Sequence, residues 1–165
     1  MDELDKGLAV TITGLQREAA LAACRRQMQG WGLAVPPAEP LVLDFGLGDF
    51  TSTGLIEYWI ANEMSAGYCG KYLFLFDGQT CPRHRHKEKH ETFFVVKGRV
   101  RTTLGERVFE MEAGEVLTVP PGIFHSLTGI GPALLLELSM PCKISDNEFA
   151  DVRIPLGGES EESPQ

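Results

Sequence analysis

Three histidines and one glutamate, widely separated along the chain, are of the types that bind a divalent metal ion. They are His84, His86, Glu91 and His125. Residues two apart in a β-strand point to the same side, so His84 and His86 can contact one ion together. Three neutral imidazoles and one carboxylate leave a dication with net positive charge and with room for water or substrate. The spacing therefore predicts a metal site with open coordination, which suits Lewis-acid chemistry.

The residues around this set follow two recurrent patterns. The stretch from Gly78 to Gly98 fits G-x5-H-x-H-x4-E-x6-G, and the stretch from Gly114 to His125 fits G-x5-P-x-G-x2-H. These are the two motifs of the cupin superfamily, which the chain resembles from about Gly70 to Ser139. Cupins often have Asn where this chain has Gly129, but that Asn is not a metal ligand. The resemblance implies an all-β cupin fold, a double-stranded β-helix or jelly-roll barrel, preceded here by an N-terminal helix.

Further segments are similar to the D-lyxose isomerase family, whose members are short, manganese-dependent sugar isomerases of the cupin fold. The similarity runs from about Asp44 to Ile154, and its weakest part is the compact loop between His86 and Glu91. It implies an aldose–ketose isomerase with one divalent metal, Mn²⁺, for which Fe, Co and Zn are the alternatives. The sugar stays open between D-lyxose/D-xylulose and D-mannose/D-fructose. The segments that carry the similarity are Leu43-Asp-Phe-Gly-Leu-Gly48, Tyr68-Cys-Gly-Lys71, Gly78-Gln-Thr-Cys-Pro82, Pro120–His125, Glu137 and Asp151-Val-Arg153-Ile.

Glu137 is the candidate general base. It lies in the otherwise apolar run Ala133–Ser139, where a carboxylate is costly unless it faces a polar cavity. Strand alternation places it on the opposite side from Leu136 and Leu138. We expect desolvation to raise its pKa toward the useful range for a base. The catalytic glutamate of the family falls at this position.

Three more charged residues are predicted to contribute to the site. Lys71 interrupts the aromatic run Tyr68–Phe76, so it either extends from a sheet edge or points into the cup as a catalytic, substrate-binding cation. Asp146 and Arg153 lie in the C-terminal segment that the family folds over the mouth of the barrel. We expect them to bind substrate, and the alternative is charge pairing at the surface.

Four other residues are weighed as members of the site. Cys81 is close to His84 but is expected to be a small buried residue, because the ligand set is complete without it. His90 adjoins Glu91 and so points the other way in an extended chain. Tyr58 and Trp59 either stack on a sugar ring or belong to the core.

The elements that position these residues follow from the sequence pattern. Thr13-Gly-Leu-Gln16 has the spacing of a capping box, and a helix is expected to run to about Met28. Its predicted packing stripe is Leu15, Ala19, Ala22 and Ala23. We predict three parts: an N-terminal extension with one helix (1–40), the cupin barrel (41–156) and a disordered tail (157–165). The predicted strands are Leu41–Phe45, Gly54–Asn62, Gly67–Phe76, Thr92–Val96, Arg99–Leu104, Arg107–Met111, Val116–Val119, His125–Gly129 and Ala133–Ser139, with a turn at Gly98 and a hairpin at Gly105-Glu106.

Composition excludes several classes of partner. The 165 residues carry a net charge of −8, which argues against nucleic acid and anionic membranes. No apolar run approaches the ~20 residues of a membrane span, and no signal-peptide pattern is present. The four cysteines form no CxxC pair, which favours reduced thiols and a cytoplasmic location. The expected partners are a small sugar substrate and a second copy in a homodimer, paired through Leu134–Leu138 or Leu41–Phe45.

Two other functions share this ligand set. One is a cupin dioxygenase, since three histidines and a glutamate also bind iron in enzymes that cleave enediols with oxygen. The other is a non-catalytic cupin that binds a sugar and regulates a partner. That second alternative leaves the cost of a buried Glu137 unexplained.

Overall fold

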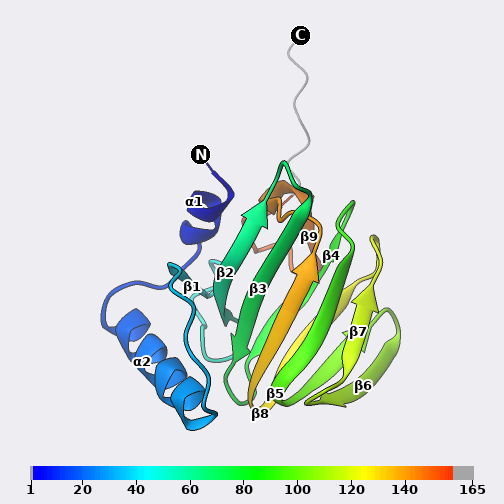
Figure 1. Ribbon diagram of the computed structural model, residues 1–165. Coiled ribbons are helices and arrows are strands. Elements are labelled where there is room, and N and C mark those ends of the chain that lie inside the picture. Colours follow the sequence, from blue (N-terminus) through cyan, green and yellow to red (C-terminus); the bar gives the residue numbers. More distant parts are fainter. Residues whose placement is uncertain (1, 158–165) are drawn as a thin grey trace.

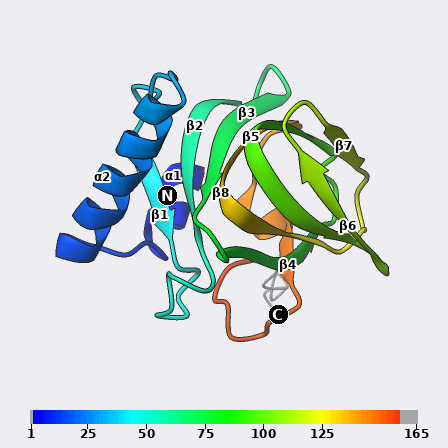
Figure 2. The same ribbon diagram turned by 90° about the horizontal axis from the view of Figure 1, so that it is seen from below.

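Antiparallel strands curl into a single barrel-like sheet in the computed structural model, which describes residues 2–157. Two helices precede this sheet, and the barrel opens between its two layers (Figures 1 and 2). No helix in this part of the chain is both long and apolar enough to cross a membrane. The elements are α1 (Glu3–Leu8), α2 (Gly14–Gly30), β1 (Pro40–Leu43), β2 (Leu55–Glu63), β3 (Tyr68–Leu75), β4 (Thr80–His86), β5 (Glu91–Leu104), β6 (Arg107–Glu112), β7 (Val116–Val119), β8 (His125–Ser139), the 3₁₀ turn η1 (Ile144–Asp146) and β9 (Asn147–Phe149).

The two longest strands, β5 and β8, organise the barrel. Residues 133–139 of β8 lie between β3 and the first half of β5. Residues 125–128 of β8 lie between β4 and the second half of β5. Each long strand therefore belongs to both layers, and the two halves of β8 carry His125 and Glu137 to the same cavity.

The turn predicted at Gly98 is wrong, because β5 continues through it. Gly98 has a φ of +79° and lies in a region where the β5–β8 register shifts on both sides of Lys97. A Cβ at this position would collide with the backbone of Pro132 and Ala133. Glycine is thus required for close strand approach at a bulge. Likewise, the two strands predicted between His125 and Ser139 are one strand, β8.

One predicted hairpin is confirmed, and two strands were not predicted. The hairpin at Gly105-Glu106 is confirmed, since Leu104 pairs with Arg107 across it. Strands β4 and β9 are absent from the predicted set, although the grouping of His84 with His86 assumed an extended segment there. Apart from Gly157, the tail predicted to be disordered lies outside the described residues.

Helix α2 covers the outer face of the β1–β2–β3–β8 layer (Figure 2). Its predicted stripe is wrong: Leu15 is 84% exposed, and the buried positions are Ala20, Leu21, Cys24 and Met28. Packing against the sheet is confirmed, through a core shared with Ile56, Tyr58, Phe74 and Leu134. Thr13 is the N-cap, but its side chain makes no capping hydrogen bond. The N-terminal extension also contains a second helix, α1, which the sequence pattern did not predict.

Most of the apolar side chains proposed for dimer pairing are used within the chain. Leu41, Val42 and Leu43 are buried, as are Leu134 and Leu135. They fill the barrel interior or the interface with α2. These residues are therefore unavailable to a second copy.

Candidate active site

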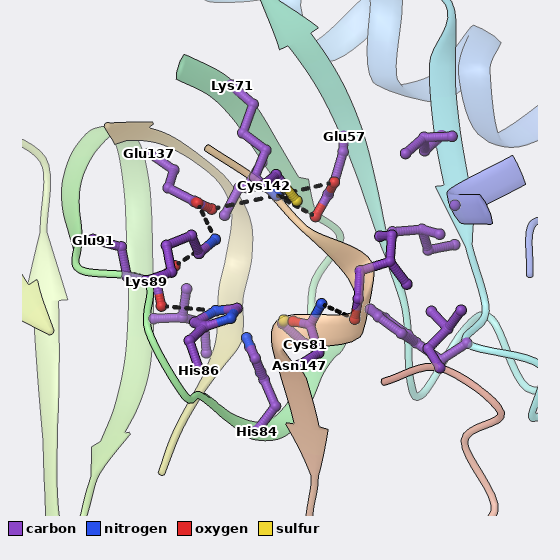
Figure 3. A pocket seen from close by; sticks show the side chains of 18 of the residues that line it. Glu57, Lys71, Cys81, His84, His86, Lys89, Glu91, Glu137, Cys142 and Asn147 are labelled. Atoms are coloured by element: carbon purple, nitrogen blue, oxygen red, sulfur yellow. Dashed lines mark hydrogen bonds and ion pairs between the residues drawn. The ribbon is translucent and has the colours of Figure 1, made fainter. Parts of the chain in front are cut away.

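The four predicted metal ligands converge in one cavity. Figure 3 labels three of them, His84, His86 and Glu91. His84 and His86 project from β4, Glu91 begins β5 and His125 begins β8. The β4–β8 register pairs His84 with His125, which brings the distant histidine beside the His-x-His pair. One ligand atom from each residue lies within 4.8 Å of the others. Segments far apart in sequence thus present four donor groups to one point.

Hydrogen bonds orient two of the imidazoles. The Nδ1 of His84 lies 2.8 Å from the carbonyl oxygen of Pro82, and that of His125 lies 3.0 Å from that of Ile123. With Nδ1–H donating to a carbonyl, Nε2 is left unprotonated and free to bind a metal.

Several buried polar atoms of the cluster have no hydrogen-bond partner within the part of the chain that the structure describes. The Oε2 of Glu91 lies 3.0 Å from the Nε2 of His86 and 3.0 Å from the Nε2 of His125. None of these three atoms has a hydrogen-bond partner of suitable geometry among residues 2–157, and Glu91 is only 1% exposed. Buried polar atoms without partners cost about 1–3 kcal/mol each. A divalent cation bound among them would remove this cost, so the residues present fit a metal.

The electrostatics of the cluster suit metal binding. Burial, reinforced by the neighbouring imidazoles of His125 and His86, holds the pKa of His84 well below its usual value. Burial also lowers the pKa of His86. Burial works to raise the pKa of Glu91, but Lys89 and the two adjacent imidazoles outweigh it and hold that pKa well below its usual range. Neutral imidazoles and an ionised carboxylate are the forms that bind a metal.

Beside the candidate metal ligands lies Glu137, 3% exposed and held between two lysines (Figure 3). Lys89 Nζ donates to its Oε1 at 2.8 Å, and Lys71 Nζ lies 3.6 Å from its Oε2. Ser139 Oγ also donates to Oε1, at 3.1 Å. The expectation of a raised pKa is wrong. Burial works in that direction, but the ammonium groups of Lys71 and Lys89 overcome it and lower the pKa of Glu137.

Lys71 points into the cavity rather than along a sheet edge. It is directly opposite Glu137 in the β3–β8 register. Its Nζ also lies 3.3 Å from Glu57 and 5.4 Å from the centre of the Trp59 ring. The indole nitrogen of Trp59 in turn donates to Glu57 at 2.7 Å. A buried charge network therefore extends from the candidate ligand Glu91 through Lys89, Glu137 and Lys71 to Glu57.

Sequence reasoning missed Lys89 and Glu57. Lys89 is buried and bridges Glu137 and Glu91, with its Nζ 3.2 Å from the Oε1 of Glu91. Its position two residues before Glu91 was the available signal, because an extended chain turns both side chains the same way. Glu57 alternates with Trp59 in the same manner, and both line the cavity.

The structure does not bring every predicted residue into the cavity. The side chain of Arg153 is 74% exposed, pairs with Asp151 at 2.6 Å and does not line the cavity. Asp146 is buried but is also absent from the lining. Trp59 lines the cavity, whereas Tyr58 lies in the core under α2. Cys81 is buried and outside the ligand set, and His90 is exposed.

Comparison with known proteins relates this fold to described families. The cupin domain model matches residues 75–139, which include all four candidate ligands. An L-ribose isomerase of Cellulomonas parahominis, solved with L-ribose, superposes with a TM-score of 0.72 at 14% identity, over 88% of this chain and 95% of that one. That similarity shows a shared fold.

Curated relatives are closer in sequence. The D-lyxose/D-mannose isomerase of Thermosediminibacter oceani is 33% identical, over 74% of this chain and 83% of the relative. The D-lyxose ketol-isomerase of Cohnella laeviribosi is 32% identical, over 74% of this chain and 84% of the relative. With its barrel, its ligand set and these relatives, the chain belongs to the D-lyxose isomerase family of cupin proteins.

Proposed function

We propose that this protein interconverts D-lyxose and D-xylulose, with D-mannose and D-fructose as the related hexose pair, through a cis-enediol and with one bound Mn²⁺. The relatives' names support an aldose–ketose isomerase. The single observation that carries the chemistry is the ionised Glu137 beside the unpartnered donor atoms of His86, Glu91 and His125. A base next to an electrophile is what aldose–ketose isomerisation requires.

The chain's residues can perform the proton transfers. Glu137 is the proposed base that takes the proton from C2 and returns it to C1, while the hydroxyl proton passes from O2 to O1 in the same conversion. Lys89 and Lys71 keep Glu137 ionised before the transfer, and Lys71 is placed to stabilise negative charge on the enediolate. When bound, the divalent ion supplies Lewis-acid polarisation of the sugar carbonyl. A buried cavity excludes bulk water, which strengthens each of these interactions.

Substrate entry requires the cavity to widen. Its volume is about 60 Å³, whereas ligand sites typically span about 300–1,000 Å³. Gly7 of α1, Ile144 of η1 and Phe149 of β9 line it on one side, and Glu3 of α1 accepts a hydrogen bond from the amide of Ile144. We propose that α1 and the segment after β8 move apart to admit a sugar.

An isotope experiment tests the enediol route. One ligand cluster is present among the described residues, and hydride-shift isomerases generally bridge both sugar oxygens with two metals. Deuterium at C2 of D-lyxose should therefore exchange into solvent during turnover, as followed by NMR. Any loss of deuterium to solvent excludes a hydride shift, whereas complete retention would leave either a hydride shift or a transfer by Glu137 shielded from water. Unchanged activity of Glu137→Gln together with complete retention would exclude the enediol route. The assay is run without oxygen, because a cupin dioxygenase would then stop while an isomerase continues.

The contact between Lys89 and Glu137 predicts a shift in pH dependence. Replacing Lys89 by Met removes one of the two cations that lower the pKa of Glu137. A base must be ionised, so the acid limb of the kcat/KM profile should move to higher pH in this variant. The matched control is Lys143→Met, which removes an exposed lysine paired with Glu88. If the acid limb of Lys89→Met is unchanged, ionisation of Glu137 does not set the acid limb of the profile.

Three finer assignments belong to the same proposal. Mn²⁺ is preferred over Fe, Co and Zn because the family is manganese-dependent. A homodimer and a cytoplasmic location stay predictions from the sequence. The first is measured by sedimentation and the second by fractionation.

A further inference from the structure

The three imidazoles of the cluster are not held in the same way. Backbone carbonyls accept from the Nδ1 of His84 and of His125. The Nδ1 of His86 is buried and has no hydrogen-bond partner among the described residues. The ring of His86 therefore lacks the orienting contact that the other two possess.

A carboxylate from the C-terminal segment lies on that side of His86. The Oδ2 of Asp146, in η1, is 3.8 Å from the Nδ1 of His86. This exceeds hydrogen-bond distance, and a small rotation of the imidazole would close it. Asp146 is 7% exposed, so its charge is only weakly screened by solvent. Metal-binding histidines commonly donate their second N–H to a carboxylate, which fixes the tautomer and raises ligand basicity.

The same carboxylate holds the loop between β4 and β5. Its Oδ1 accepts from the amide of Glu88 at 2.8 Å, and its Oδ2 accepts from the amide of Lys89 at 3.0 Å. Lys89 is the residue whose ammonium bridges Glu91 and Glu137. Both oxygens of Asp146 are thus committed to the protein, and the side chain does not line the cavity.

We propose that Asp146 is a positioning residue of the metal centre and does not bind the sugar. It holds the His86 ring with Nε2 directed at the ion, and it fixes the loop that places Lys89 between Glu91 and Glu137. This rests on the metal site of the proposed function but not on its substrate. It also replaces the substrate-binding role that the sequence predicted for Asp146.

Metal affinity of Asp146→Asn tests the proposal. The amide leaves one oxygen for the loop and turns an N–H donor toward the Lys89 amide and the His86 ring. The Kd for Mn²⁺, measured by titration without sugar, should rise about 10–100-fold. At saturating Mn²⁺ the KM for D-lyxose should stay near the wild-type value. The matched control, Asp151→Asn, removes a carboxylate of the same C-terminal segment and should bind Mn²⁺ like the wild type.

A second readout isolates the contact with His86. In the zinc-loaded protein, the Nδ1–H proton of His86 should give a downfield NMR signal that moves in Asp146→Asn. If Asp146→Asn does not fold, Asp146→Ser, which keeps one acceptor for the loop, takes its place in both measurements.

Three results would overturn the proposal. A Kd within twofold of the wild type removes the positioning role. An unchanged Kd for Mn²⁺ together with a raised KM for the sugar would show that Asp146 binds substrate, as the sequence predicted. A weakened Kd with an unmoved His86 signal shows that Asp146 does not orient the ring. Because the titration needs no sugar, failure to turn over a pentose would count against the proposed function alone.

Discussion

Glu137→Gln is expected to lower kcat by about 10³-fold, within the ~10²–10⁴ range of general acid–base catalysis. The amide keeps the shape of the side chain and can still accept from Lys89, but it cannot take a proton from carbon. Glu137 is not among the metal-ligand cluster, so the affinity for Mn²⁺ should change little. Steady-state kinetics with D-lyxose, together with Mn²⁺ titration, measure both quantities on the same preparation.

The control for this variant is Glu148→Gln. The side chain of Glu148 is 41% exposed and pairs with Arg85 outside the cavity, so the substitution removes a carboxylate without entering the site. Its kinetics should match the wild type. Full activity in Glu137→Gln would remove this residue from the mechanism, whereas loss of both metal and activity would show a structural role.

Removal of the metal should abolish activity and should also lower the free energy of unfolding. Chelation leaves Glu91 and two imidazole nitrogens buried without partners, and the proposed electrophile is lost. Activity should fall to background and return on addition of Mn²⁺. A ligand that binds only the folded state at 100 times its Kd adds about 2.7 kcal/mol to the free energy of unfolding. Urea denaturation with and without Mn²⁺ measures that difference.

Two histidine variants locate this effect. His125→Asn removes a buried ligand, and its stability should no longer depend on Mn²⁺. His90→Asn changes an exposed histidine beside Glu91 that is outside the cluster, so it should keep the full metal response. Equal stabilisation of both variants by Mn²⁺ would place the ion elsewhere.

The clustering of the four candidate ligands was predictable because each of the two motifs is a short, local pattern. His84 and His86 share a strand, and spaced motifs carry Glu91 and His125, so recognition needed no knowledge of the packing. The inward direction of Glu137 also followed from alternation with Leu136 and Leu138. Its pKa did not follow, because the direction of the shift depends on Lys71 and Lys89, which approach from two other segments.

Other features depend on contacts between distant segments. The buried stripe of α2 includes Cys24 and Met28 instead of the predicted positions, because the sheet decides which face of an alanine-rich helix is buried. Gly98 resembles a turn residue in sequence, but its role is set by the backbone of β8 pressing against it. The contacts of Asp146 depend on the packing of η1 against the loop between β4 and β5, which is distant in sequence.

The convergence of four side chains on one ion is tested most directly by diffraction from a Mn²⁺-soaked crystal at the manganese absorption edge. One anomalous peak should appear within coordination distance of His84, His86, Glu91 and His125, close to Glu137. An empty cavity at saturating Mn²⁺, or a peak bound by other residues, would contradict the proposed site and the chemistry that depends on it.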